Sequence, residues 1–271
     1  MLKKGFILLA IGVVLLTSFF ACTAEEREVG ERAPKESVTM GSITITITYD
    51  NNPYDSRLMT AWGFSCVVGL PKQTILFDTG GDGSILLNNM KELGIEPKEI
   101  DAVVLSHIHG DHTGGLASFL NENSDVTVYL PRSFPQSFKS GVESFGAKVE
   151  EIQEAKELFG GVFTTGELNG GIKEQALVIE TSSGLVVITG CAHPGVVAIV
   201  RKAKQITGDE VYLVLGGFHF PEPSVVQSFK ELGVQKAAPC HCSGDEAREL
   251  FKERYGEDYI EIGVGKGITV P

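Results

Sequence analysis

The chain is poor in the residues that nucleic-acid-binding proteins use. Lys and Arg total only 23 against 35 Asp and Glu, which gives a formal net charge of −12. A surface this acidic repels a phosphate backbone, and no run of basic residues offsets the repulsion. We therefore expect no nucleic-acid partner, although the acidity does not identify the partner that the protein does have.

Cysteine is also scarce. One of the five cysteines lies near the N-terminus, and the others form neither a CxxC pair nor a zinc-finger spacing: Cys66, Cys191, Cys240 and Cys242. We expect these four to be buried or strand-end thiols, although an exported protein could form a disulfide whose partners the spacing does not identify.

Residues 1–22 have the layout of a secretory signal. Two lysines precede the apolar stretch 5–20, which ends at Ala21-Cys22. This stretch is shorter than the roughly 20 residues that usually span a bilayer. A cysteine after a small residue resembles a bacterial lipobox, although Phe19 stands where leucine is usual. We expect an exported protein anchored by lipid at Cys22, with an uncleaved anchor or plain secretion as the alternatives.

The rest of the chain divides into a tether and one large domain. Residues 23–40 are largely polar and lack hydrophobic periodicity, as expected of a tether. Residues 41–271 are long enough for one substantial core. Overall, 42% hydrophobic and 21% charged residues are ordinary for a globular protein. We therefore expect a folded domain over residues 41–271.

Strand patterns dominate the first half of the domain and alternate with helical patterns later. Residues 43–49 (ITITITY) alternate strictly, as in a half-buried strand. Further strands are expected at 66–70, 74–77, 102–105, 126–130, 176–180, 185–189, 211–215, 236–238 and 259–264. Helices are expected at 84–94, with Ser84 as N-cap, at 133–145, after Pro194, and at 224–232 and 244–255. This order indicates an α+β fold with mixed sheets covered by helices.

Three of only six histidines occur in the run HIHGDH at residues 107–112, directly after a predicted strand. Neutral imidazole and carboxylate are good ligands for zinc, iron or manganese. In an irregular turn, His107 and His109 can point to one side while Asp111 and His112 point to the other. One short loop can thus supply ligands to two adjacent ions. Core packing does not explain the run, because each side chain would need its own buried partner.

The other three histidines also follow apolar strands. His193 lies in GCAHPG, His219 in GGFH, and His241 between two cysteines. Loops at strand ends are where rigid scaffolds present reactive side chains. All six histidines are therefore candidates for one site.

The segments FDTG at residues 77–80 and HIHGDHTGG at residues 107–115 resemble the metallo-β-lactamase superfamily, and the resemblance runs from about residue 43 to the C-terminus. It implies a four-layer αββα sandwich with two divalent metal ions at one edge, between two sheets. It assigns His107, His109 and His193 to the first metal. Asp111, His112 and His241 are assigned to the second metal, and Asp78 would brace the histidine loop through hydrogen bonds.

Three further motifs narrow the resemblance: GCAHPG at 190–195, GGFH at 216–219 and PCHCSG at 239–244. They resemble the branch containing the dihydropterin–ribofuranosylaminobenzene-phosphate synthases of methanopterin-type cofactor biosynthesis. A cytoplasmic pterin reaction fits poorly with an exported lipoprotein. The resemblance therefore implies the site rather than the substrate.

One position departs from the family pattern. Many members bridge their metals with an aspartate after the strand that here ends at Gly217, so we expect the second metal to bind more weakly. His219 is expected to act as a ligand, an acid/base or a substrate contact, with a structural histidine as the alternative. Cys191, two residues before His193, could be a soft ligand, but a packed thiol is favoured.

These residues predict hydrolysis, or group transfer, of a small phosphorylated or acyl substrate through water activated by two divalent metal ions. Zinc is the expected metal, with iron or manganese as alternatives. Asp111 would orient the nucleophile and His219 would protonate the leaving group. Lactone or thioester hydrolysis and an inactive, lipid-anchored binding protein are the alternatives. A redox role is disfavoured because the ligand set is not carboxylate-rich. The sequence does not indicate which oligomeric state the protein adopts.

Overall fold

The computed structural model describes Met1, Leu2 and residues 41–271. The expected signal, the Cys22 lipid site and the tether lie outside the described residues, apart from Met1 and Leu2, and stay predictions. Within the described part of the chain, no helix is both long and apolar enough to cross a bilayer.

Two mixed sheets form the centre of the domain. The first has the strand order β13-β1-β2-β3-β4-β5-β6 and the second β12-β11-β10-β9-β8-β7. The first sheet consists of β1 (Ile43–Tyr49), β2 (Ser65–Gly69), β3 (Thr74–Phe77), β4 (Ala102–Val104), β5 (Thr127–Pro131), β6 (Lys148–Ile152) and β13 (Gly267–Val270). The second consists of β7 (Lys156–Phe159), β8 (Val162–Thr164), β9 (Leu177–Thr181), β10 (Gly184–Thr189), β11 (Val211–Gly217) and β12 (Lys236–Cys240).

Side-chain alternation along the strands separates the apolar residues into layers. Ile43, Ile45 and Ile47 of β1 point into the layer between the sheets, where they meet Val186 and Ile188 of β10. The intervening apolar positions of other strands face outward and pack under helices. A strand with period two can serve two apolar layers only when both faces of its sheet are covered.

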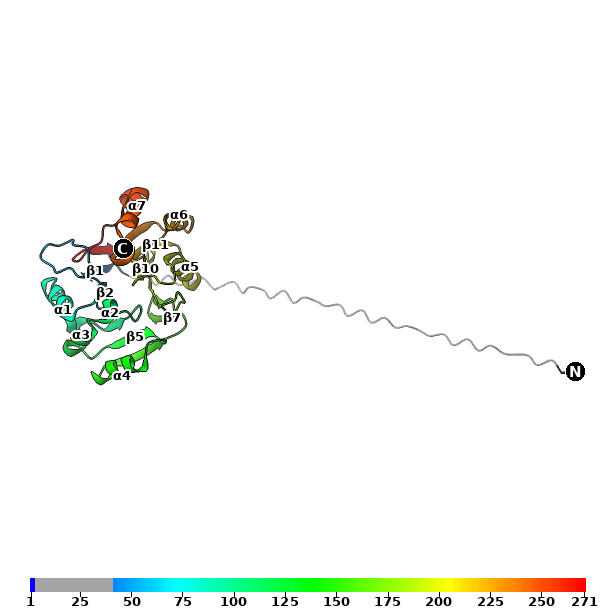
Figure 1. The fold of residues 1–271 in the computed structure, drawn as a ribbon, viewed down its shortest axis with the longest axis horizontal. Coiled ribbons are helices and arrows are strands. Elements are labelled where there is room, and N and C mark those ends of the chain that lie inside the picture. The colour runs from blue at the N-terminus through cyan, green and yellow to red at the C-terminus, as the bar shows by residue number, and fades with distance from the viewer. Residues whose placement is uncertain (3–40) are drawn as a thin grey trace. The chain divides into compact units, whose positions relative to one another are not determined.

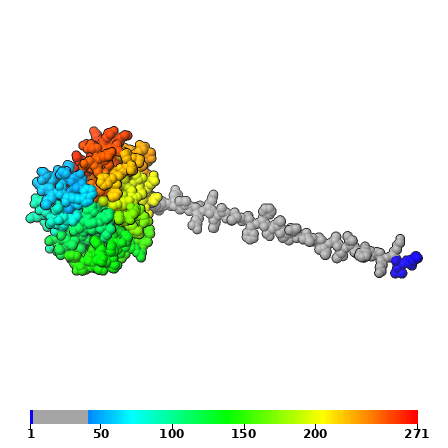
Figure 2. Space-filling model, in the orientation of Figure 1, coloured from blue at the N-terminus to red at the C-terminus, as the bar shows by residue number. Residues whose placement is uncertain are grey.

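Helices cover the outer face of each sheet (Figure 1). Leu86 and Phe119 pack on the first sheet, and Ile199, Phe229 and Phe251 on the second. The first set consists of α1 (Gly83–Glu92), α3 (Leu116–Glu122) and α4 (Gln136–Ser144), and the second of α5 (Val196–Thr207), α6 (Ser224–Glu231) and α7 (Asp245–Tyr255). In Figure 2 the first half of the domain, coloured blue to green, and the last part, coloured yellow to red, occupy different sides of the visible surface. The expected four-layer αββα sandwich is confirmed.

Several local expectations were wrong. The closing strand is β13, not 259–264, where only Tyr259 and Val264 make isolated bridges. Gly265, with φ +92°, turns the chain there before β13 pairs with β1. Strands β6, β7 and β8 were not anticipated. β6 and β7 are edge strands with charged, partly exposed sequences. β8 is an inner strand of only three residues, too short to show an alternating pattern.

The N-terminus of α1 also differs from the expectation. Asp82 is the N-cap, and its Oδ1 accepts hydrogen bonds from the backbone N–H groups of Ser84 (2.8 Å) and Ile85 (3.1 Å). Aspartate satisfies two donors that the first helical turn leaves free, and its charge complements the helix dipole. Ser84 is therefore a residue of the first turn and not the cap.

A buried carboxyl lies where β1 ends. Asp50 is fully buried, and its Oδ1 accepts hydrogen bonds from the backbone N–H (2.7 Å) and side-chain amide (2.5 Å) of Asn52. Its Oδ2 has no hydrogen-bond partner among the described residues. Burial raises the pKa of Asp50 to about 6.

Because this pKa is raised in the folded protein, the unfolded chain ionises first as the pH rises, and stability falls. The rise from 3.8 to about 6 corresponds to roughly 3 kcal/mol lost between about pH 4 and about pH 7. We expect the unfolding free energy of Asp50→Asn, relative to wild type, to increase by that amount across this window in urea titrations. Exposed Asp125→Asn is the control. A pH-independent difference for Asp50→Asn would contradict the assignment.

Candidate metal centre

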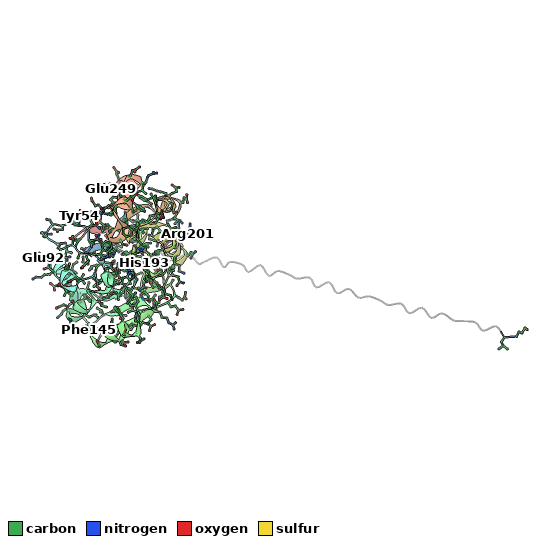
Figure 3. All side chains as sticks on the ribbon, viewed as in Figure 1. Tyr54, Glu92, Phe145, His193, Arg201 and Glu249 are labelled. Atoms are coloured by element: carbon green, nitrogen blue, oxygen red, sulfur yellow. The ribbon has the colours of Figure 1, made fainter. Side chains whose placement is uncertain are left out.

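The candidate ligands meet because they follow parallel strands. Strands β3, β4 and β5 are parallel to one another, as are β10, β11 and β12, so the carboxyl ends within each set share one edge. Asp78 follows β3, His107 follows β4, and His193, His219 and His241 follow β10, β11 and β12. Figure 3 shows His193 near the middle of the domain in this view, with the other labelled residues toward its periphery.

The first ligand group consists of His107, His109 and His193. One nitrogen from each lies within 4.8 Å of the others, and His107 Nε2 is 3.1 Å from His109 Nδ1. Burial and the neighbouring histidines lower the pKa of His107. Burial and the adjacent His219 lower that of His193 to about 4. Both rings are thus held in the neutral form that binds metal.

The second ligand group consists of Asp111, His112 and His241, the residues predicted for the second metal, together with Cys191. Asp111 Oδ2 is 3.3 Å from His241 Nε2 and 3.7 Å from His112 Nε2. Cys191 Sγ is 3.2 Å from the same nitrogen of His112. Burial opposes ionisation of Asp111, but His241 and His112 outweigh it and hold its pKa well below the ordinary range. The two groups are contiguous, since the ring centroids of His107 and His112 lie 4.2 Å apart.

These separations fit a divalent metal. With the bond lengths that zinc makes to nitrogen, oxygen and sulfur, two ligand atoms of a tetrahedral site lie roughly 3.3–3.8 Å apart. The closest measured pairs in both groups lie between 3.1 and 3.7 Å. In addition, His193 Nε2 and His241 Nε2 are buried without a hydrogen-bond partner among the described residues. Buried imidazole nitrogens of this kind fit a cation as the partner.

Asp78 orients one histidine of each group. Its Oδ2 accepts a hydrogen bond from His112 Nδ1 (2.7 Å) and another from the Ser106 hydroxyl (2.7 Å), while Oδ1 accepts from the Ser106 backbone N–H (2.7 Å). Ser106 Oγ is in turn 2.9 Å from His107 Nδ1. The Nδ1 protons of both histidines are thereby engaged, which leaves Nε2 free to bind metal. These contacts supply the geometry that a bracing role of Asp78 requires, and the role itself stays a prediction.

Asn51 orients the third histidine in the same way. Its Oδ1 accepts a hydrogen bond from His241 Nδ1 (2.9 Å), so Nε2 of His241 faces Asp111. Nothing in the sequence suggested this role, because Asn51 belongs to a polar turn after β1. The contact spans 190 positions of the chain.

Glu174 is a second residue that the sequence did not reveal. It is fully buried, and its Oε1 accepts hydrogen bonds from the backbone N–H groups of Gly190, Cys191 and Ala192, while Oε2 accepts from that of His193 at 2.8 Å. Burial raises the pKa of Glu174, although these N–H donors oppose the rise. One carboxylate thus holds the whole loop that carries a ligand of each group.

The loops at this edge are locally strained. In the described part of the chain, the five non-glycine residues with positive φ all lie here: Asp78, Ala192, His219, Phe220 and His241. Such conformations cost of order 1–3 kcal/mol each and persist where surrounding contacts determine them. His241, one of these residues, begins a short 3-10 helix, η2 (His241–Ser243). This turn brings the Cys242 thiol to the Cys191 carbonyl.

His219 lies beside the first group rather than within it. Its ring centroid is 4.3 Å from that of His193, and the side chain is exposed.

The four cysteines within residues 41–271 are free and buried, as expected. A hydrogen bond that the Cys191 thiol donates to the Cys242 side chain, together with burial, raises the pKa of the Cys191 thiol, although a bound cation deprotonates a coordinating thiol.

A hollow of about 310 Å³ adjoins the second group, and its lining includes Trp62, Phe220, His241 and Arg248. The ring centroids of Trp62 and His241 are 4.8 Å apart. Two larger hollows, of about 520 and 640 Å³, involve α6 and α7, and none of their lining residues is a candidate ligand. Volume alone therefore does not locate the site.

Comparisons with known proteins agree with this geometry. The family described as the metallo-beta-lactamase superfamily matches residues 63–239. The chain is 32% identical over 276 residues to the 7,8-dihydropterin-6-methyl-4-(beta-D-ribofuranosyl)-aminobenzene-5'-phosphate synthase of Methanocaldococcus jannaschii, covering 82% of this chain and 94% of that protein.

Solved structures give the same result. Tm1679, a metal-dependent hydrolase of the beta-lactamase superfamily, matches with a TM-score of 0.70 and 26% identity over 83% of this chain and 98% of that one. The metallo-beta-lactamase fold protein YhfI from Bacillus subtilis matches with a TM-score of 0.63 and 16% identity over 84% and 99%, a likeness of fold alone.

The αββα sandwich, with candidate metal ligands at the strand ends, defines the class of metal-dependent enzymes built on this fold. The chain belongs to the metallo-β-lactamase superfamily. The expected resemblance to the dihydropterin–ribofuranosylaminobenzene-phosphate synthase branch is confirmed by the match to the Methanocaldococcus protein.

Glu174→Gln tests the role of the buried glutamate. An amide nitrogen cannot accept a hydrogen bond, so at least one buried N–H of the loop loses its partner, at a cost of about 1–3 kcal/mol. We expect this loss in urea unfolding, and a zinc affinity about 10- to 100-fold weaker in calorimetric titration. Glu253→Gln, at an exposed glutamate, should change neither. Equal behaviour of the two variants would refute the role of Glu174.

Proposed function

We propose that this protein is a metal-dependent hydrolase or transferase that acts on a small anionic substrate at a dinuclear centre. The proposal is carried by the two contiguous ligand groups, in each of which the ligand atoms all lie within 4.8 Å of one another. Zinc suits this mixture of imidazole, carboxylate and thiol, and iron suits it as well. When bound by these residues, divalent metal would supply a water of lowered pKa and would polarise a carbonyl or phosphoryl oxygen.

The chain's own residues position the reacting groups. Asp111, half-buried and ionised, faces both His112 and His241 and can accept a hydrogen bond from the attacking water. His219 is exposed beside His193, where a leaving group could take its proton. The buried faces of the ligand loops exclude bulk water, which strengthens these electrostatic contacts.

Arg248 favours a substrate that carries negative charge. Its Nη1 donates to Asn52 Oδ1 (2.7 Å) and Asp245 Oδ1 (3.3 Å), whereas its buried Nε has no hydrogen-bond partner in the described residues. The side chain is 17% exposed and lines the hollow next to His241. Guanidinium groups bind phosphate and carboxylate in two-pronged geometry. Trp62 provides an apolar wall for the rest of the substrate.

The first test removes a ligand. We expect Asp111→Asn and His107→Ala to lower turnover by about 10²-fold or more and to reduce bound zinc, because each removes an atom of one ligand group. Circular dichroism should stay close to wild type, and the melting temperature should fall because less metal stabilises the folded state. Asp125→Asn, at an exposed position, is the matched control. A metal-depleted Asp111→Asn variant with wild-type turnover would sink the proposal.

The second test identifies the substrate class. We expect hydrolysis of a nitrophenyl phosphodiester in preference to a homoserine lactone or an acyl thioester. Arg248→Met should raise KM for the phosphodiester by about 10- to 100-fold, because a charge-assisted hydrogen bond is lost. Lys252→Met, at an exposed position of the same helix, should leave KM unchanged. Preference for the lactone, with no effect of Arg248→Met, would favour the lactone and thioester alternative.

A further inference from the structure

The Cys191 thiol points into the second ligand group. Its Sγ lies 3.2 Å from His112 Nε2, the nitrogen that the Asp78 hydrogen bond leaves free. The ligand atoms of Asp111, His112, His241 and Cys191 all lie within 4.8 Å of one another. Cys191 is only 4% exposed, so its sulfur faces these ligands instead of solvent. This is the placement of a fourth ligand and not of a thiol packed among apolar side chains.

A carboxylate has no room at the nearby position where one was expected. A Cβ added to Gly217 would lie 2.6 Å from Cys242 Sγ and 3.2 Å from Cys191 Cα, and would also collide with the Gly190 carbonyl. The backbone of the loop that carries Cys191 therefore occupies the space that a side chain at Gly217 would need. The same loop brings the Cys191 sulfur to the second group.

We propose that Cys191 is a fourth protein ligand of the second metal, bound as a thiolate beside Asp111, His112 and His241. This inference rests on the proposed function, because it requires a metal at that site. When the metal–sulfur bond forms, the thiol proton passes to solvent, so one proton is released for each thiolate ligand.

The consequence is a difference between the two sites. Four protein ligands complete a tetrahedral shell, as in sites that hold zinc structurally, whereas the three histidines of the first group leave one position open for water or substrate. A thiolate also favours zinc, cobalt or iron over magnesium or manganese. The second ion is thus retained by the protein, and the first is the one accessible to exchangeable ligands.

Cys242 is the competing thiol. Cys191, His219 and Cys242 also lie within 4.8 Å of one another, and the Cys242 thiol donates to the Cys191 carbonyl at 3.7 Å. That trio contains no carboxylate, and its histidine is exposed. The second group, with an ionised Asp111 and two buried histidines, is the more complete site, and Cys242 supplies a matched control.

Cobalt(II) substitution tests the assignment without relying on activity. A thiolate bound to cobalt(II) gives a near-ultraviolet charge-transfer band that nitrogen and oxygen ligands do not give. For the full chain, purified with reductant and loaded with cobalt, we expect this band and about two ions per chain. Cys191→Ser should lose the band and retain about one tightly bound ion. Cys242→Ser should keep both the band and the ions.

The outcomes separate this inference from the proposed function. Persistence of the band in Cys191→Ser, or its loss only in Cys242→Ser, overturns the assignment. Two cobalt ions in the wild type without the band overturn it while leaving the proposed function intact. A wild type that binds no cobalt removes the proposed function itself. If Cys191→Ser does not fold, X-ray absorption of the wild-type zinc protein decides: a sulfur neighbour at about 2.3 Å supports the thiolate, and its absence refutes it.

Discussion

The buried carboxylate of Asp78 is the contact on which the metal centre depends. It accepts three hydrogen bonds, from His112 and from the backbone and hydroxyl of Ser106. A buried carboxylate without partners would cost several kcal/mol, whereas hydrogen bonds to a charged group contribute about 1.5–3 kcal/mol each. The carboxylate is therefore stable only while the histidine loop keeps its conformation, and the loop keeps that conformation only while the carboxylate is present.

This mutual dependence links the two ligand groups. His112 belongs to the second group and bonds Asp78 directly, whereas His107 belongs to the first and is reached through Ser106. On the other sheet, the Glu174 carboxylate plays the same part for the loop between Gly190 and His193. Each sheet thus presents part of its ligand set on a loop fixed by a buried carboxylate, whereas His241 is oriented by Asn51. The positive φ of Asp78 and of Ala192 is compatible with these contacts, because each residue belongs to a segment that one of the two carboxylates holds.

The layered arrangement of sheets and helices, and most of the candidate ligands, could be predicted from the sequence. Alternation in β1 and the helical periodicity of α5 report burial directly, and the HIHGDH run is too dense to be explained by packing. It was not sufficient for Asn51 or Glu174, because their roles arise from contacts across 190 and 19 positions and not from any local pattern. Edge strands such as β6 were not predicted for a related reason: their partial exposure removes the apolar pattern on which strand prediction relies.

The position of the Cys191 thiol depends on the glycine at position 217. A glycine at position 217 lets the backbone at Gly190 approach closely, since Gly217 N–H donates to the Gly190 carbonyl at 3.0 Å. That approach carries the Cys191 thiol to within contact of His112. A side chain at Gly217 would push the two strand ends apart and withdraw the sulfur. The absent carboxylate and the inward-facing thiol are therefore two consequences of the same close packing of β10 against β11.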